Sequence, residues 1–273
     1  MIDTVYRSES ELRRPLRFLG EAIADLRTSP AIAWQLFRSN LRARYRRAWL
    51  SYLWLLLPTL GTTLVWVYVQ SRQLVGIAPT GIPYPVYVLA GTILWQVFAE
   101  SLAAPLQQLV AGRMLITRSR VPHEALILAG VFEVLLNCAV RLVVLAAVLV
   151  WFGLGAGPTL LLVPIGIGGL ALLGLTFGLL VLPAGILYDD VGRAITLLTG
   201  FWFFLTPILY RASSQGLLRF NPVTPLLVAT RAWLTAERAP SNLAPVMISS
   251  FAILIFAWLF QRLARPHVVA RLG

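Results

Sequence analysis

The sequence contains no lysine, since all 23 of its basic residues are arginine. A phosphate-binding loop of the G-x-x-x-x-G-K-[ST] type needs a lysine that contacts the nucleotide phosphates. The chain therefore cannot carry such a loop, and no ATP cofactor is expected on it. If ATP drives its activity, we expect a separate polypeptide to bind and hydrolyse the nucleotide.

Cysteine and histidine are almost as scarce. The single cysteine, Cys138, lies inside an apolar run, which excludes an internal disulfide and a cysteine-based metal site. His123 and His267 are far apart in the sequence, so a histidine metal cluster is not expected either. The first thirty residues are polar and charged without an apolar core, and we therefore expect no cleavable signal peptide.

Charged residues make up only 12% of the chain, whereas about 25% is typical of a soluble domain. Together with 58% hydrophobic residues and a mean hydropathy of +0.78, this composition indicates an integral membrane protein. A net charge of +12 can also indicate nucleic-acid binding. However, the arginines cluster beside apolar runs, where loop charge sets membrane orientation. Nucleic acid is therefore not an expected partner.

Residues 1–48 are predicted to form amphipathic helices at the cytoplasmic face of the membrane. Apolar residues recur every three or four positions from Leu12 to Leu26, which places them on one helix face. Ser29 and Pro30 are then expected to cap and begin a new helix. The apolar stripe of this second helix contains Trp34, Phe37, Leu41, Tyr45 and Ala48.

The second helix also carries five arginines just before the first apolar run: Arg38, Arg42, Arg44, Arg46 and Arg47. A helix with an aromatic stripe and an arginine face is typical of the membrane interface. Each arginine near anionic headgroups contributes about 1 kcal/mol of attraction. We interpret the cluster first as a membrane anchor.

Six apolar segments follow, each near the roughly 20 residues that cross a bilayer. The sequence therefore predicts an all-α membrane domain over residues 49–262 and a cytoplasmic tail over 263–273. The predicted spans are about 49–70, 84–109, 124–152, 159–187, 194–211 and 243–262. Six spans place both termini on one side, and the segments on that side hold 17 arginines against five opposite. This asymmetry predicts cytoplasmic termini.

The fourth predicted span is rich in glycine. Gly174 and Gly178 stand four residues apart, so they share one face of a helix. Small residues at this spacing allow two helix backbones to approach closely within a membrane. We therefore predict that this span packs tightly against a neighbour.

Five stretches of the sequence, in order, carry a family resemblance. They are LRARYRRAWLSYLWLLLP (41–58), YPVYVLAGTILWQVFAESL (84–102), RMLITRSRVPHEA (113–125), YDDVGR (188–193), and FFLTPILY with NPVTPLLVATR (203–210 and 221–231). They resemble the permease subunits of ABC-2 type exporters, specifically the polysaccharide (O-antigen) export branch. Departures from the family pattern are Ser51-Tyr52 for its Gly-Pro, Asp189 for the arginine of Y-R-D, and His123 for the basic residue of F-P-[RK]-E.

The resemblance implies an ATP-driven exporter of a lipid-linked polysaccharide in the bacterial inner membrane. Its assembly would contain two copies of this chain and two ATP-binding subunits that use ATP and magnesium. It also implies that residues 212–240 form short re-entrant helices at the outer face. The 111–123 loop would carry a coupling helix that docks on the ATPase. The candidate coupling residues are Arg113, Arg118, Arg120, Pro122, His123 and Glu124.

A second interpretation of the arginine cluster follows from this resemblance. A lipid-linked glycan carries a negatively charged pyrophosphate that must enter from the cytoplasmic leaflet. Arginine's planar fork binds phosphate oxygens in pairs, which lysine cannot match. The candidate pyrophosphate or headgroup residues are Arg42, Arg44, Arg46 and Arg47.

A polar strip interrupts the third predicted span. Glu133, Asn137 and Arg141 are spaced by four residues, so they lie on one helix face. Glu100 of the second span is expected at a depth similar to that of Glu133. Glu100 is therefore a possible partner for Arg141. A charge at mid-membrane normally faces the helix bundle or a water-filled cavity. The strip is therefore either a clamp between helices or part of the glycan path.

Aromatic residues gather near the beginnings and ends of the first and fifth predicted spans. Such residues form belts at membrane interfaces, but flat rings with a polar tip also suit the amphipathic faces of sugars. The candidate path residues are Tyr52, Trp54, Trp66, Tyr68, Phe201, Trp202, Phe204 and Tyr210.

Functions other than glycan export would require different sequence features. An exporter of this family could carry another cargo, such as a capsule, teichoic acid, a small drug or a lipid. A membrane-embedded lipid-modifying enzyme would need grouped acidic or histidine side chains. Only Asp189 and Asp190 are paired carboxylates, and they lie in a stretch that resembles the family's turn. A proton-coupled transporter would show internal repeats. We therefore predict a non-enzymatic permease without catalytic or metal-binding residues.

Overall fold

The computed structural model describes residues 15–47, 51–76, 79–115, 121–154, 157–211, 220–235 and 243–272. Throughout these ranges the regular structure is helical, which confirms the all-α prediction. The elements, in chain order, are α1 (Pro15–Arg47), α2 (Ser51–Ser71), α3 (Tyr84–Ala111), α5 (His123–Trp151), the 3-10 helix η2 (Pro158–Leu162), α6 (Val163–Leu187), α7 (Asp190–Leu205), α8 (Val223–Leu234) and α9 (Ala244–Leu272).

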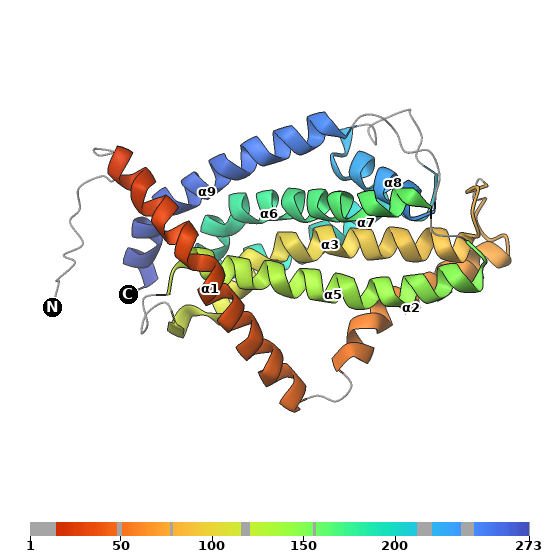
Figure 1. The fold of residues 1–273 in the computed structure, drawn as a ribbon, viewed down its shortest axis with the longest axis horizontal. Coiled ribbons are helices and arrows are strands. Elements are labelled where there is room, and N and C mark those ends of the chain that lie inside the picture. The colour runs from red at the N-terminus through yellow and green to blue at the C-terminus, as the bar shows by residue number, and fades with distance from the viewer. Residues whose placement is uncertain are drawn as a thin grey trace.

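Helix α3 occupies the centre of a bundle (Figure 1), with its closest neighbours α6 and α5. Helices α2 and α9 lie farther out, and α1 crosses one end of the bundle diagonally. We call this end, where α9 finishes and α5 begins, the α1 end. The opposite end carries α8 and is called the α8 end.

Two glycines explain the close contact between α3 and α6. A Cβ atom at Gly174 would lie 2.4 Å from the carbonyl oxygen of Phe98, and one at Gly178 would lie 2.4 Å from that of Leu102. No other residue can occupy these positions without moving the helices apart. The predicted tight packing of this glycine-rich helix is therefore confirmed.

Five helical segments of the described chain are long and apolar enough to cross a membrane. They are Leu53–Ser71, Tyr84–Ala111, His123–Trp151, Pro158–Leu187 and Ala244–Leu263. The fifth predicted span, 194–211, is instead the 16-residue helix α7, which ends at Leu205. Thr206 is extended because it precedes Pro207, and a residue in that place disfavours the helical conformation.

The helix break predicted at Ser29 and Pro30 is wrong, because α1 continues from Pro15 to Arg47. Ser29 caps no new helix, and its hydroxyl instead donates a 2.6 Å hydrogen bond to the backbone carbonyl of Asp25 in the preceding turn. Ser29 is also fully buried. Pro30 lacks the N–H that would donate to the carbonyl of Leu26, so α1 continues past it with one helical hydrogen bond fewer.

Candidate functional site

Helix α1 is attached to the bundle by an apolar patch at its middle. Ala33 and Phe37 are buried against Ala129 of α5. The ring of Trp34 lies 5.4 Å from that of Phe37 and 5.9 Å from that of Phe132. Part of the predicted aromatic stripe therefore packs on α5, although half of the Trp34 surface remains exposed.

The arginine cluster divides between two environments. Arg44 forms an ion pair with Glu133 of α5, and Gln108 of α3 donates to the other oxygen of this carboxylate at 3.0 Å. Arg42 is exposed instead. It lines a surface pocket of about 300 Å³ together with Gln35, Arg38 and Ser39. The side chains of Arg46 and Arg47 lie outside the described residues.

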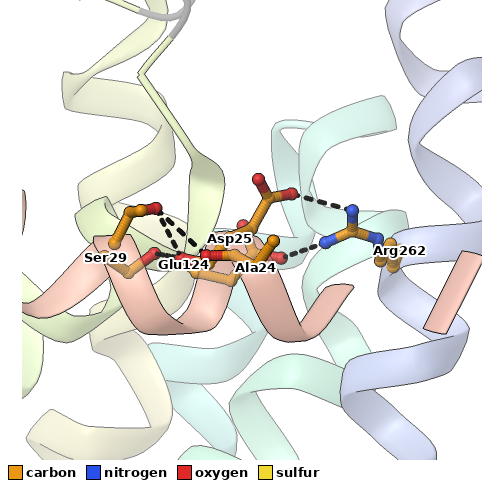
Figure 2. A network of polar contacts seen from close by, with 6 residues as sticks. Ala24, Asp25, Ser29, Glu124 and Arg262 are labelled. Carbon is orange, nitrogen blue, oxygen red and sulfur yellow. Dashed lines mark hydrogen bonds and ion pairs between the residues drawn. The ribbon is translucent and has the colours of Figure 1, made fainter. Parts of the chain in front are cut away.

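A second ionic contact joins three elements at the α1 end (Figure 2). Arg262 of α9 contacts Asp25 of α1 at 2.8 Å through one nitrogen and Glu124 of α5 at 3.2 Å through the other. The Arg262 and Glu124 side chains are only 9% and 3% exposed. Neither Asp25 nor Arg262 was singled out from the sequence, because no local pattern pairs residues this far apart in the chain.

The loop predicted to couple the chain to an ATPase lies at the same end of the bundle. Gly112 follows the last residue of α3, and Pro122 precedes the first residue of α5. Arg113 is exposed and His123 is partly buried. Glu124, in contrast, is turned into the protein, so it is not a surface residue of the loop. Arg118 and Arg120 lie outside the described residues.

The polar strip of α5 is divided in a similar way. Arg141 contacts Glu100 of α3 at 2.5 Å, and Asn137 donates to the other Glu100 oxygen at 3.1 Å. The Arg141 side chain is 5% exposed. These three residues clamp α3 to α5, whereas Glu133 belongs to the separate contact with Arg44. The Glu100 carboxylate neutralises the buried charge of Arg141. This pairing favours a clamp between helices over a polar strip that lines the glycan path.

The candidate path aromatics also fall into two groups. Trp202 points inward, where its indole N–H donates to the side-chain oxygen of Asn221 at 3.1 Å and its ring contacts Phe98 and Phe177. Trp66 and Tyr210 are partly buried, and the side chain of Tyr52 lies outside the described residues. More than half of each remaining side chain is exposed, namely Trp54, Tyr68, Phe201 and Phe204.

A buried arginine holds the α8 end together. Arg231 of α8 donates to the carbonyl of Pro207 at 3.1 Å and to the hydroxyl of Tyr87 at 2.7 Å. Its guanidinium carbon lies 3.6 Å from the centre of the Tyr87 ring, within the range of a cation–π contact. The Tyr87 hydroxyl in turn donates to the carbonyl of Tyr210. The turn after α7 is therefore fixed to α3 and α8, a contact that sequence reasoning missed.

The similarity of this chain to known proteins extends over most of its length and is not confined to one site. No family model matches the chain. It is 26% identical over 235 residues to the O-antigen export system permease protein RfbA of Myxococcus xanthus, which covers 82% of this chain and 87% of that protein. Two proteins of the same name from Klebsiella pneumoniae are 24% and 22% identical, and each match covers 70% of this chain and 75% of the relative.

Proposed function

We propose, on the premise that this chain belongs to the ABC-2 type family of O-antigen export permeases, that it is the membrane subunit of an ATP-driven exporter of a lipid-linked polysaccharide. The observation that carries the proposal is similarity to three O-antigen export permeases, along four fifths of the chain for one of them and 70% of it for the other two. The absence of lysine supports ATP hydrolysis on a separate subunit, because a chain without lysine cannot form the usual phosphate-binding loop.

In the proposed topology α7 is a short sixth span beside the five longer ones. Successive helices α2, α3, α5, α6, α7 and α9 run alternately between the α1 end and the α8 end, which supports six crossings. The α1 end is then cytoplasmic and the α8 end faces outward, as the distribution of arginines predicts. Helix α8, with 12 residues, is too short to cross and is proposed as a re-entrant helix of the inner-membrane protein.

The proposed homodimer is supported by aromatic surface that one chain leaves open. Trp54 and Tyr68 project from α2, and Phe201 and Phe204 from α7, all more than half exposed. We propose that a second copy of this chain faces these helices and that the exposed rings line the route of the glycan. Rings offer sugars broad contact with few fixed hydrogen bonds, so a polymer can slide past them.

The pyrophosphate hypothesis is changed in detail by the contacts of α1. Arg44 is engaged by Glu133, so we now propose that it holds α1 on α5 rather than binding a headgroup. Arg38 and Arg42 share a pocket with Gln35 and Ser39 on the exposed side of α1. Two guanidinium groups at one opening suit a pyrophosphate, which accepts paired hydrogen bonds from arginine.

The test of the proposed function is deletion of this chain from a cell that displays the glycan. We expect the surface glycan to disappear and the lipid-linked glycan to accumulate inside, with both effects reversed by the wild-type chain. Purification of the complemented protein should recover an ATP-binding subunit. Unchanged surface glycan in the deletion strain would show that the chain does not export it.

The arginine pocket has its own test, which preserves charge. Replacing both Arg38 and Arg42 by lysine should leave membrane insertion intact and reduce export, because lysine does not form the paired contacts. Arg27→Lys is the matched control, since Arg27 is also an exposed arginine of α1 but lies outside the pocket. Equal export by the double variant and the control would leave the pocket no role in binding phosphate.

A further inference from the structure

The contact of Arg262 with two acids joins parts of the chain that the sequence separates widely. Asp25 lies 237 positions before Arg262, and Glu124 lies 138 positions before it. The three residues belong to α1, α5 and α9, and Figure 2 shows the guanidinium group of Arg262 facing both carboxylates. One side chain thus connects the crossing helix, the start of α5 and the last helix.

The geometry depends on a guanidinium group. Separate nitrogens of Arg262 reach the separate acids, at 2.8 Å for Asp25 and 3.2 Å for Glu124. A lysine ammonium has a single nitrogen on a flexible stem, so it cannot reproduce a planar fork aimed in two directions. A buried ion pair contributes little net stability compared with apolar packing, but it can specify one arrangement of the elements that it joins.

The position of Glu124 connects this contact to the loop between α3 and α5. Glu124 is the second residue of α5 and directly follows the loop that begins after α3. Helix α1 touches α5 again farther along, where Arg44 pairs with Glu133. A displacement of the loop's end would therefore reach α1 at two charged contacts, and it would reach α9 through Arg262.

We propose that Arg262 is a positioning residue that makes the end of the 111–123 loop, helix α1 and the α1 end of α9 move as one body during transport. This inference rests on the proposed function, because it assumes that an ATP-binding subunit pushes on that loop. The loop supplies the movement, Glu124 receives it, and Arg262 transfers it to Asp25 and to its own helix. Arg262 touches no cargo in this scheme.

The test uses the complete transporter, with this chain and its ATP-binding subunit. Arg262→Gln and Asp25→Asn should each accumulate in the membrane and retain ATP hydrolysis, while export falls by about tenfold, a typical size for coupling between two sites. Asp25→Asn is included because it keeps the buried Arg262–Glu124 pair and so disturbs folding least. Arg262→Lys should recover only part of the loss.

The matched control is Arg193→Gln on α7. Arg193 pairs with Asp190 at 3.6 Å, but both side chains are almost fully exposed, so its loss should change neither hydrolysis nor export. Wild-type export by Arg262→Gln and Asp25→Asn would overturn the proposal. A parallel loss of hydrolysis and export in both variants would also overturn it, since that result indicates impaired assembly rather than impaired transfer.

A distance measurement separates this inference from the proposed function. Spin labels at the exposed positions Ile23 of α1 and Phe260 of α9 report whether the two helices are held together. Arg262→Gln should broaden the distance distribution, whereas Arg193→Gln should leave it narrow. An unchanged distribution in Arg262→Gln would refute the link even if the transporter exports glycan. Failure of the wild-type complex to export any glycan would instead refute the proposed function.

Discussion

Helices α2 and α3 are alike in hydropathy and opposite in burial. The most apolar window of each has a mean hydropathy of 1.4, but 11% of that window is buried in α2 and 78% in α3. Hydropathy therefore predicts that each helix prefers a membrane to water, and it does not predict what covers the helix. In a bilayer both lipid and protein are apolar, so packing partners must be recognised from other features.

The features that place α3 at the centre are small residues opposite it and polar residues along it. Gly174 and Gly178 of α6 let the two backbones approach, and Glu100 pairs with Arg141. Helix α2 has less of either. Its Thr59 donates to Gln96 of α3 at 2.8 Å, while apolar side chains cover its outer face.

The largest loss of stability is expected when the ion pair that holds α3 on α5 is removed, because no equivalent pair holds α2 among the residues that the structure describes. Arg141→Leu should destabilise the protein by about 3–5 kcal/mol, because it leaves Glu100 charged and partly buried without its partner. The additional change Glu100→Gln should recover part of this loss. Thermal unfolding of the purified protein in detergent measures both variants. A single variant as stable as wild type would show that the pair does not hold α3 on α5.

A smaller effect is expected from a methyl group between α3 and α6. Gly174→Ala should cost about 1–3 kcal/mol, since overpacking forces the helices apart. Gly61→Ala in α2 is the control, because its added Cβ meets nothing within 4 Å. Alanine is also the better helix former by about 1 kcal/mol, so this control should be neutral or slightly stabilising. Equal unfolding temperatures for the two variants would contradict the difference in packing.

The smallest effect on stability is expected on the outer face of α2. Trp54→Leu and Tyr68→Leu should each change the free energy of unfolding by less than about 0.5 kcal/mol, as is usual for exposed positions. If these rings face a second copy and the glycan, export should nevertheless fall, and cysteine cross-linking between copies at these positions should succeed. Normal export and no cross-linking would assign this face to lipid.

The sequence predicted contacts that follow a local period and missed those that do not. Asn137 and Arg141 were placed on one face by their spacing, and Glu100 was recognised as a possible partner. Glu133 has the same spacing, yet it pairs with Arg44 because α1 crosses α5 at that level. Arg262 could not have been matched to Asp25, since only the packed bundle brings them together.

Helix boundaries were hardest to predict where proline occurs. The sequence predicts a helix that starts at Pro30, but Pro30 lies within α1, and the helix contacts the bundle on both sides of it, through Asp25 before it and through Ala33 and Phe37 after it. Pro207 was included in a predicted span, although it ends the helix before it. Proline is thus tolerated inside a helix at Pro30, whereas the helix ends just before Pro207. Tertiary contacts decide between them, and a local pattern carries no information about those contacts.

If α7 crosses the membrane as proposed above, its short length bears on the thickness of the surrounding bilayer. Sixteen residues at a rise of 1.5 Å give a helix of about 24 Å, whereas the hydrocarbon core is about 30 Å thick. Such hydrophobic mismatch is relieved when the lipids thin locally around the shorter helix. The turn beyond Leu205 needs no water at that depth, because Arg231 and Tyr87 satisfy the carbonyls of Pro207 and Tyr210. A hydrophilic polymer moving beside α7 would therefore cross less hydrocarbon than one moving beside α3.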